Sequence, residues 1–473
     1  MEATSELTFS EKYMIADAML LDLEDQFSKD LIINNDLNRK LVSFQSNKSE
    51  PIFRWFHYRE GFSKELIEYI VNTLEIKSGT FLDPFAGTAT APFTVQNYLQ
   101  SKSYAIELMP VGVFFIECRN LFSKIGYKKL LDFTQKIKNS RNQWLSVDKH
   151  DQFNHIKITD GAFTSDTEKE LMQFLKWSEN TKDSEFHIFC KFIGLCILEA
   201  ISFTRKDGQY LRWDHRSPRF ADKKPNSFSK GEILTFFDGL SKKINDIESD
   251  IQECSDQLIE GVNNTIELIQ GSCLSEISSI PDSSIDAVIT SPPYCNRYDY
   301  TRTYALELAY LGTDEIGIRK LRQDLLSCTV ENKAKEFSKF IDKSTLDLVD
   351  EIFYQQHELI SILTFLEDEA KSGKLNNKGI VTMVKGYFYD MTLHLIQTYQ
   401  KLKKSAKYVM VNDNVRYNGL NIPIDLLLSK IARDIGYKVD KIWVLPKGKG
   451  NSSQQMKIYG RSELRKCVYI WSK

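Results

Sequence analysis

The sequence lacks a run of apolar residues long enough to cross a membrane. Its longest apolar stretch, residues 186–203, is interrupted by His187, Lys191 and Glu199, whereas a membrane-spanning helix needs about 20 nearly uncharged residues. Residues 1–12 are acidic and polar and lack the apolar core of a secretory signal. We therefore expect residues 186–203 to form a buried helix in a cytoplasmic protein that contacts no membrane.

Paired cysteines and an excess of one charge are also lacking. The eight cysteines among 473 residues include no C-x-x-C pair, which argues against a zinc site and against a disulfide framework. The formal net charge is only −2, so contact with nucleic acid would need a local basic surface. The composition is 42% hydrophobic and 27% charged, as in soluble globular proteins. The chain is too long for one hydrophobic core, so we expect two or three domains. From the cysteine pattern we expect no metal.

Two short motifs each follow an apolar run that is typical of a buried parallel strand. Asp-Pro-Phe-Ala-Gly-Thr at residues 83–88 follows the run 79–82, and Thr-Ser-Pro-Pro-Tyr at residues 290–294 follows the run 285–289. In an open α/β sheet, ligands bind in the crevice beyond the carboxyl ends of such strands. A turn of small residues also lets a nucleoside cofactor approach the backbone closely. Both motifs are therefore predicted to lie at the ligand-binding edge of one sheet.

Strands and helices alternate in two parts of the chain, which predicts a doubly wound, mostly parallel sheet. The expected strands are 81–82, 103–107, 265–269, 285–289, 379–384, 408–412, 438–445 and 466–471, and the expected helices are 91–99, 390–402 and 424–435. The last two strands are joined by a long loop and can form an antiparallel hairpin. Residues 306–370 are expected to form a helical cover.

The two motifs and their order resemble those of the DNA amino-methyltransferases, which move a methyl group from S-adenosylmethionine to an exocyclic nitrogen of a base. The resemblance covers about residues 50–120 and 262–473. It implies a class I methyltransferase fold, Rossmann-like, with a mostly parallel seven-stranded sheet. In that family the first motif reads Phe-x-Gly-x-Gly, whereas here Ala89 replaces the last glycine.

The resemblance suggests a division of the chain. We assign residues 51–120 and 262–473 to the catalytic domain and residues 1–50 to a helical N-terminal extension. Residues 121–261 form a large insertion with several helical segments and little strand rhythm. Apolar residues three and four positions apart at 240–258 predict a long helix packed on its own domain, with a coiled coil as the alternative. We interpret the insertion as a mainly helical target-recognition domain.

The predicted cofactor site rests on the spacing of its residues and on the resemblance to the family. Glu107 ends the strand after the glycine turn, about 20 residues on, where an acidic residue commonly binds ribose hydroxyls. The resemblance implies that Asp83 contacts the amino group of the cofactor and that residues 271–273 contact its adenine. It also implies that the aromatic segment 53–63, which leads into a helix capped by Ser63, closes over the methionine end of the cofactor. The predicted cofactor contacts are Asp83, Phe85, Gly87, Thr88, Glu107, Ser272, Cys273, Phe56 and Tyr58.

The predicted catalytic turn is Ser291, Pro292, Pro293 and Tyr294. An amino nitrogen of a base is a weak nucleophile because its lone pair is delocalised into the ring. The Ser291 hydroxyl and the Pro292 carbonyl can accept its two N–H hydrogens, the prolines stiffen the turn, and Tyr294 offers a face for a flipped base. In the family, Ser at the first position favours cytosine N4, and Asp or Asn favours adenine N6. Cys295 is expected to be a packing residue, because the Pro-Cys loop and Glu-Asn-Val partner of a C5-directed nucleophile are absent.

Two segments combine basic residues with aromatic or amide groups. Residues 204–216 form a turn-rich segment with Arg and Gln, the usual groove contacts, and Lys, a usual phosphate contact; a solvated loop over the catalytic turn is the alternative. A second basic stretch surrounds residues 448–460. For Arg297 and Arg302 a phosphate contact and a structural salt bridge are both open. The predicted DNA contacts are Arg205, Lys206, Gln209, Arg212, Arg297, Lys449 and Arg461.

These features favour a cytosine-N4 DNA methyltransferase that acts on double-stranded DNA in a restriction-modification or phage-defence system. Its expected partners are a cognate restriction enzyme or defence-system subunits, and its expected location is the nucleoid when it is bound to DNA. Three alternatives remain: an adenine-N6 DNA methyltransferase, an RNA-base methyltransferase, and a non-catalytic DNA-binding subunit.

Overall fold

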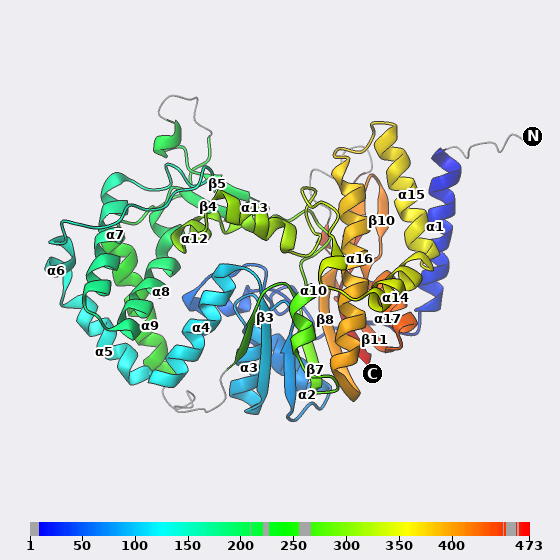
Figure 1. Ribbon diagram of the computed structural model, residues 1–473, viewed down its shortest axis with the longest axis horizontal. Coiled ribbons are helices and arrows are strands. Elements are labelled where there is room, and N and C mark those ends of the chain that lie inside the picture. The colour runs from blue at the N-terminus through cyan, green and yellow to red at the C-terminus, as the bar shows by residue number, and fades with distance from the viewer. Residues whose placement is uncertain are drawn as a thin grey trace, which may run out of the picture.

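The computed structural model describes residues 9–208, 210–220, 227–254, 266–447, 449–450, 460 and 463–473. A central sheet lies between two groups of helices (Figure 1). One group comes from residues 110–253 and lies at one end of the molecule; the other lies at the opposite end and includes the first helix, α1 (Phe9–Gln26).

The central sheet has eight strands in the order β1-β11-β14-β8-β7-β2-β3-β6. Their bounds are β1 Leu31–Ile33, β2 Thr80–Asp83, β3 Lys102–Glu107, β6 Glu267–Gln270, β7 Ile285–Thr290, β8 Leu402–Asp413, β11 Lys438–Val444 and β14 Lys466–Ser472. Strand β14 runs antiparallel to both of its neighbours, and the other pairings are parallel. The mostly parallel sheet and the antiparallel last pair are confirmed. The expected count of seven strands was wrong, because β1 extends the sheet by pairing with β11.

Side chains alternate between the two faces of the sheet, as strand geometry requires. In β2, Phe81 joins the apolar core beneath helix α2 (Lys64–Thr73), and Leu82 joins the core beneath α16 (Gly379–Lys401). Ser63 caps the start of α2, and its hydroxyl accepts a 3.1 Å hydrogen bond from Leu66 N. Apolar cores therefore cover both faces of the sheet at β2.

The strand expected at residues 379–384 is wrong, because these residues form the start of α16. Ile380, Met383, Val384, Tyr387 and Met391 are all buried, and their spacing of three and four residues places them on one side of a helix. A short apolar run alone does not distinguish a strand from a buried helix.

Within the described ranges, the residues of the insertion form the end of α4 (Pro110–Ile125), five further α-helices, the 3-10 helix η3 (Pro218–Phe220) and one hairpin. The five helices are α5 Tyr127–Lys138, α6 Arg141–Leu145, α7 Ser165–Asn180, α8 Ser184–Ile201 and α9 Phe236–Glu253, and the hairpin pairs β4 Thr204–Asp207 with β5 Tyr210–Trp213. The buried helix expected at 186–203 is α8, and α9 packs on α5, α7 and α8 as predicted. The segment expected to be an irregular turn-rich loop is instead the hairpin. The apolar core of this part also includes residues of α4 and α12 (Ala305–Tyr310).

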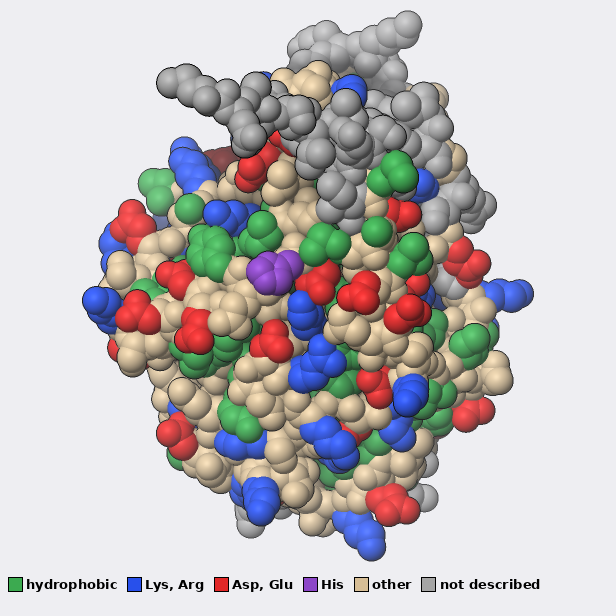
Figure 2. All heavy atoms as spheres, turned by 90° about the vertical axis from the view of Figure 1, so that its right-hand side faces the viewer, with side chains coloured by type: hydrophobic (Ala, Val, Ile, Leu, Met, Phe, Trp, Pro, Cys, Tyr) green, Lys and Arg blue, Asp and Glu red, His purple; other side chains and the backbone are tan. Residues whose placement is uncertain are grey.

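The other α-helices and short strands lie in several parts of the molecule. They are α3 Thr90–Leu99, α10 Cys273–Glu276, α11 Tyr300–Thr303, α13 Glu315–Asp324, α14 Lys343–Tyr354, α15 His357–Lys371, α17 Ile424–Ile435, and the short strands β9 Val415–Tyr417, β10 Leu420–Ile422, β12 Lys449–Gly450 and β13 Glu463–Leu464. Helix α1 packs on α15, and acidic and basic side chains are interspersed over this end of the molecule (Figure 2). Among the described helices, none combines the length and apolar character that crossing a membrane would require.

Candidate active site

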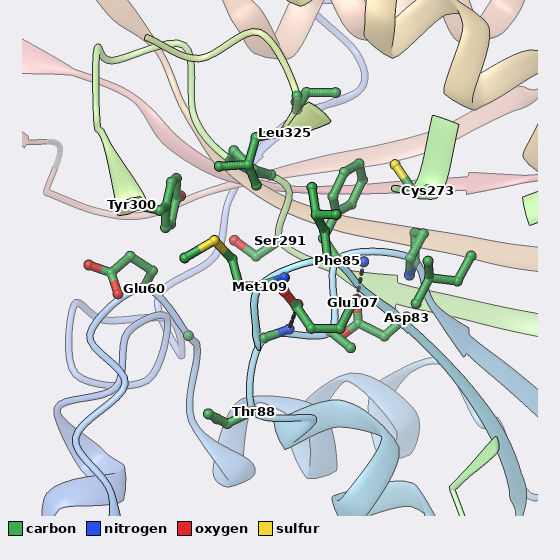
Figure 3. A pocket seen from close by; sticks show the side chains of 18 of the residues that line it. Glu60, Asp83, Phe85, Thr88, Glu107, Met109, Cys273, Ser291, Tyr300 and Leu325 are labelled. Atoms are coloured by element: carbon green, nitrogen blue, oxygen red, sulfur yellow. Dashed lines mark hydrogen bonds between the residues drawn. The ribbon is translucent and has the colours of Figure 1, made fainter. Parts of the chain in front are cut away.

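The two sequence motifs meet at one pocket, beyond the carboxyl ends of β2, β3 and β7. About 770 Å³ of empty space, open solvent at the mouth included, lies between its walls. Of the predicted residues, its walls include Tyr58, Asp83, Phe85, Gly87, Thr88, Glu107, Ser272, Cys273, Ser291 and Pro293 (Figure 3). The structure thus brings together side chains that are up to about 235 residues apart in the sequence.

Phe56 is the one predicted cofactor contact that does not lie on this pocket. Its ring packs on Phe115 at 4.3 Å and on Tyr304 at 6.4 Å between ring centroids. Tyr58, two residues on, faces the pocket instead. Phe56 is therefore a core residue behind the site, and its assignment as a cofactor contact is corrected.

The glycine turn has a left-handed backbone at two positions. Gly87 has φ of 54°, and Ala89, which replaces the family's glycine, has φ of 58°. The left-handed conformation costs a residue with a side chain roughly 1–2 kcal/mol, which explains why glycine is usual at that position. A Cβ atom on Gly87 would lie 2.7 Å from Cε1 of Tyr58, so glycine is required there for space as well.

Two carboxyl groups are buried in the wall of the pocket. Asp83 accepts hydrogen bonds from the Thr290 hydroxyl and from Phe85 N, and Glu107 accepts 2.6 Å hydrogen bonds from Gly87 N and Met109 N. Burial raises the pKa of each carboxyl to about 7. A cationic or hydroxyl-bearing ligand would stabilise their charged forms.

Gly112 brings the start of α4 against this part of the pocket, and no motif marked it. A Cβ atom there would lie 2.4 Å from the Gly87 carbonyl oxygen and 2.6 Å from Cγ of Glu107. Glycine is intrinsically unfavourable in a helix, and its presence in α4 is the only sign in the sequence that this position is special.

The catalytic turn follows β7 directly, and its serine reaches the pocket. The Ser291 Oγ lies 3.2 Å from the carbonyl oxygen of Val411 and 3.2 Å from the hydroxyl oxygen of Tyr294. Its single proton can be donated to either. Pro292 is buried, and Tyr294 lies beside the pocket wall.

Lys466 and Asp413 lie behind Tyr294 and hold it from the side of β14 and β8. The ammonium group of Lys466 is 3.3 Å from the Tyr294 hydroxyl, 5.0 Å from its ring centroid and 2.8 Å from the Asp413 carboxylate. Burial alone would lower the pKa of Lys466, but Asp413 and Tyr294 outweigh it and raise this pKa. Lys466 belongs to the basic stretch around residues 448–460, which the sequence suggests as a rim of the site, and its buried place beneath Tyr294 was not foreseen.

Cys295 is fully buried in the apolar core, which confirms its packing role.

Arg302 forms salt bridges with Asp299 and Glu331, so of the two roles left open for it, the structural salt bridge is the one observed. Arg297 has a left-handed φ of 69°, and its buried Nε has no hydrogen-bond partner among the described residues. Within those residues no group of His, Cys, Asp and Glu side chains could hold a metal ion.

The hairpin presents two arginines side by side. Arg205 and Arg212 are cross-strand neighbours, their guanidinium groups lie 4.7 and 4.0 Å from the Phe228 ring centroid, and both face Asp207, at 3.9 and 2.8 Å. Their side chains are 40% and 41% exposed. Like charges directly opposite each other are unfavourable, so this face favours an anionic partner.

The other predicted DNA contacts have different outcomes. The side chain of Lys206 is only 3% exposed and pairs with Glu307, because it points to the inner side of the hairpin. Its assignment as a DNA contact is therefore corrected. Gln209 and Arg461 lie outside the described residues, and for Lys449 the structure describes only the backbone, in β12.

The sheet order, the antiparallel β14, the glycine turn and the Ser-Pro-Pro-Tyr turn at one edge define a class I α/β methyltransferase. The chain is 44% identical over 460 residues to the Type II methyltransferase M.AvaI of Nostoc sp., covering 95% of this chain and 92% of that protein. It is 42% identical over 458 residues to the Type II methyltransferase M.BsoBI of Geobacillus stearothermophilus, covering 92% and 88%. The chain therefore belongs to the Type II methyltransferases. No protein-family model and no solved structure gave a significant match.

Proposed function

We propose that this methyltransferase is a site-specific DNA-modifying enzyme of a restriction-modification system and that it methylates the exocyclic N4 of a cytosine with S-adenosylmethionine. The observation that carries the proposal is the position of Ser291, in the wall of the pocket that the glycine turn and the two buried carboxyl groups also form. The names of its relatives, Type II methyltransferases, support the general class.

The residues of the pocket fit S-adenosylmethionine. This cofactor has a cationic amino group, a charged sulfur, a ribose with two hydroxyl groups and an adenine ring. The buried carboxyl groups of Asp83 and Glu107 suit the amino group and the ribose, Gly87 leaves the backbone accessible, and Phe85 and Cys273 supply an apolar wall. When bound, the cofactor supplies a methyl group on a positively charged sulfur.

Ser291 and Pro292 would prepare the amino group of the base. If the Ser291 hydroxyl donates its proton to the Val411 carbonyl, its lone pairs are free to accept an N–H of the base. The carbonyl of Pro292 would accept the other. Together they favour a tetrahedral nitrogen with a localised lone pair, an interaction that strengthens in the transition state. Lys466 and Asp413 would hold Tyr294 so that its ring can stack on the base.

Cytosine is favoured over adenine because the turn begins with Ser rather than with Asp or Asn. Chemistry at cytosine C5 is disfavoured because Cys295 is fully buried and burial raises the pKa of its thiol well above the usual value. Digestion of methylated duplex DNA to nucleosides, followed by mass spectrometry, tests the choice: N4-methylcytosine is expected, and N6-methyladenine would contradict it.

The hairpin supports a DNA-binding role for the insertion. The paired guanidinium groups of Arg205 and Arg212 share one carboxylate, Asp207, and are oriented on Phe228 for a phosphate or a base edge. We propose that this surface contacts duplex DNA. Methylation of RNA in place of DNA would contradict this, and a protein that binds DNA without methylating it would be a non-catalytic subunit. A cognate restriction enzyme and a place at the nucleoid remain predictions.

A further inference from the structure

Glu60 joins the wall of the pocket to the segment that follows the catalytic turn. Its carboxylate accepts hydrogen bonds from the hydroxyl groups of Tyr298 and Tyr304. The Tyr304 hydroxyl also accepts a 3.1 Å hydrogen bond from Arg59 N. Burial raises the pKa of Glu60, so the carboxylate depends on these donors to remain charged. No sequence motif singled out any of these three side chains.

The two tyrosines that bind Glu60 also pack against residues in the wall of the pocket. The Tyr298 ring lies 4.9 Å from that of Tyr300, which lines the pocket, and the Tyr304 ring stacks on Tyr58 at 5.0 Å. Glu60 and Tyr300 lie on the same side of the pocket (Figure 3). The residues beyond Ser-Pro-Pro-Tyr are therefore held to the cofactor side of the site through one carboxylate.

Lys206 connects the β4–β5 hairpin to the cluster formed by Glu60, Tyr298 and Tyr304. Alternation along β4 turns Lys206 inward while its neighbour Arg205 remains on the outer face. The Lys206 ammonium group pairs with Glu307 of α12 and lies 3.4 Å from Glu199 of α8. It also lies 5.1 Å from the ring centroid of Tyr304. One strand thus presents an arginine to the outside and a buried lysine to the ring that holds Glu60.

We propose that Glu60 is a positioning residue that orders the segment after the catalytic turn through Tyr298 and Tyr304, and that Lys206 links this cluster to the hairpin. DNA contact at Arg205 and Arg212 and the ordering of the active site are then coupled. The coupling rests on the proposed function, since it requires the hairpin to contact DNA. Burying Lys206 among carboxylates costs desolvation free energy, and its contacts in both parts of the molecule offset that cost.

Removal of one hydroxyl tests the first half of the proposal. In Tyr298→Phe, the single-turnover methylation rate with saturating S-adenosylmethionine and duplex DNA is expected to fall about 10-fold or more, because small misplacements of reacting groups are costly. The dissociation constant for S-adenosylmethionine, measured by calorimetry, should change little. The matched control is Tyr389→Phe, which removes a 2.9 Å tyrosine–carboxylate hydrogen bond to Asp350 on α14 and should leave the rate unchanged.

Glu60→Gln separates positioning from direct cofactor binding. A positioning role predicts a lower single-turnover rate with nearly unchanged cofactor affinity. Weaker cofactor binding with an unchanged rate would make Glu60 a cofactor ligand and overturn the proposal, as would a wild-type rate in Tyr298→Phe. Wild-type protein that methylates no duplex DNA would instead contradict the proposed function itself.

A double-mutant cycle tests the link through Lys206. Lys206→Met and Glu307→Gln should each lower the single-turnover rate, the double variant should be no worse than the poorer single variant, and Lys206→Arg should restore part of the rate. The control Lys430→Met breaks a comparable pair with Glu358, between α17 and α15, and should affect only stability. If Lys206→Met does not fold, the cycle uses Lys206→Gln, which also removes the charge. Additive losses, or a normal rate in Lys206→Met, would exclude the link.

Discussion

The Thr290 hydroxyl donates a 2.6 Å hydrogen bond to the Asp83 carboxylate. These residues end β7 and β2, neighbouring parallel strands, and each is the first residue of one of the two functional motifs. The bond therefore sets the start of the catalytic turn against the start of the cofactor turn, within a fully buried contact.

Thr290→Val should destabilise the protein by about 1–3 kcal/mol, because it leaves a buried carboxylate oxygen without its donor. Urea denaturation measures this change. Thr290→Ser keeps a hydroxyl and should recover most of the loss. If Val and Ser variants prove equally stable, the hydrogen bond has no part in joining the two motifs.

The stability of the cofactor-free protein should depend on pH through Asp83 and Glu107. Burial raises the pKa of both carboxyl groups to about 7, whereas in the unfolded chain they titrate near 4. Between these values the folded protein keeps protons that the unfolded chain has released. Stability should therefore fall as the pH rises from about 4 to about 7 and become insensitive to these groups above that range.

Denaturation at about pH 5.5 and about pH 7.5 checks the sign of this dependence. The difference in free energy of unfolding between these pH values should shrink in Asp83→Asn. For the same reason, S-adenosylmethionine should bind more tightly as the pH rises towards 7, since its cationic amino group favours ionised Asp83. Affinity that falls over this range would remove Asp83 from contact with that group.

Ser291→Ala should lower the methylation rate on the order of 10²-fold, the effect of losing one preorganised hydrogen bond at a transition state. The cofactor dissociation constant should change much less, because the bond matters mainly as the nitrogen becomes tetrahedral. Ser284→Ala is a matched control at the other end of β7, where the hydroxyl donates to the Pro281 carbonyl. Equal effects of the two variants would exclude a specific role for Ser291.

Arg212→Ala should weaken DNA binding in a way that shows what Arg212 contacts. Loss of a phosphate contact reduces the slope of log K against log salt concentration by about 1, whereas loss of a base contact costs roughly 1–3 kcal/mol of sequence discrimination. The control is Arg141→Ala, whose guanidinium group lies 3.6 Å from the Phe237 ring centroid in the same part of the chain. An unchanged slope together with unchanged discrimination would place Arg212 outside the DNA interface.

Much of the sheet could be predicted because its strands have simple signatures. The apolar runs ending at Asp83 and Thr290 are short, buried and followed by turn residues, so both strands were expected where they occur. The start of α16 was misassigned because the short run at residues 379–384, with four large apolar residues, fits either the strand period or the helix period. Strand β1 was missed because three residues, Leu31–Ile33, are too few to show alternation, and only their pairing with β11 makes them a strand.

The walls of the pocket were predictable where a motif or a strand end marks them, and less so where distant side chains complete them. Glu60 and Lys466 belong to no motif, and their roles come from partners up to about 245 residues away. Lys206, in contrast, was assigned to the DNA interface by its sequence context although its side chain is buried. A basic residue between arginines suggested a DNA contact, but one step along a strand reverses the side on which a side chain lies.

The edge strand β1 also has a consequence for the order in which the molecule is made. Its partner β11 emerges from the ribosome about 400 residues later, and Glu24 of α1 pairs with Arg465. Residues 24–33 must therefore wait until residues 438–465 have been made before they can dock. Closing so long a loop makes this a late step, so a nascent chain should expose the edge of β11 until β1 returns to cover it.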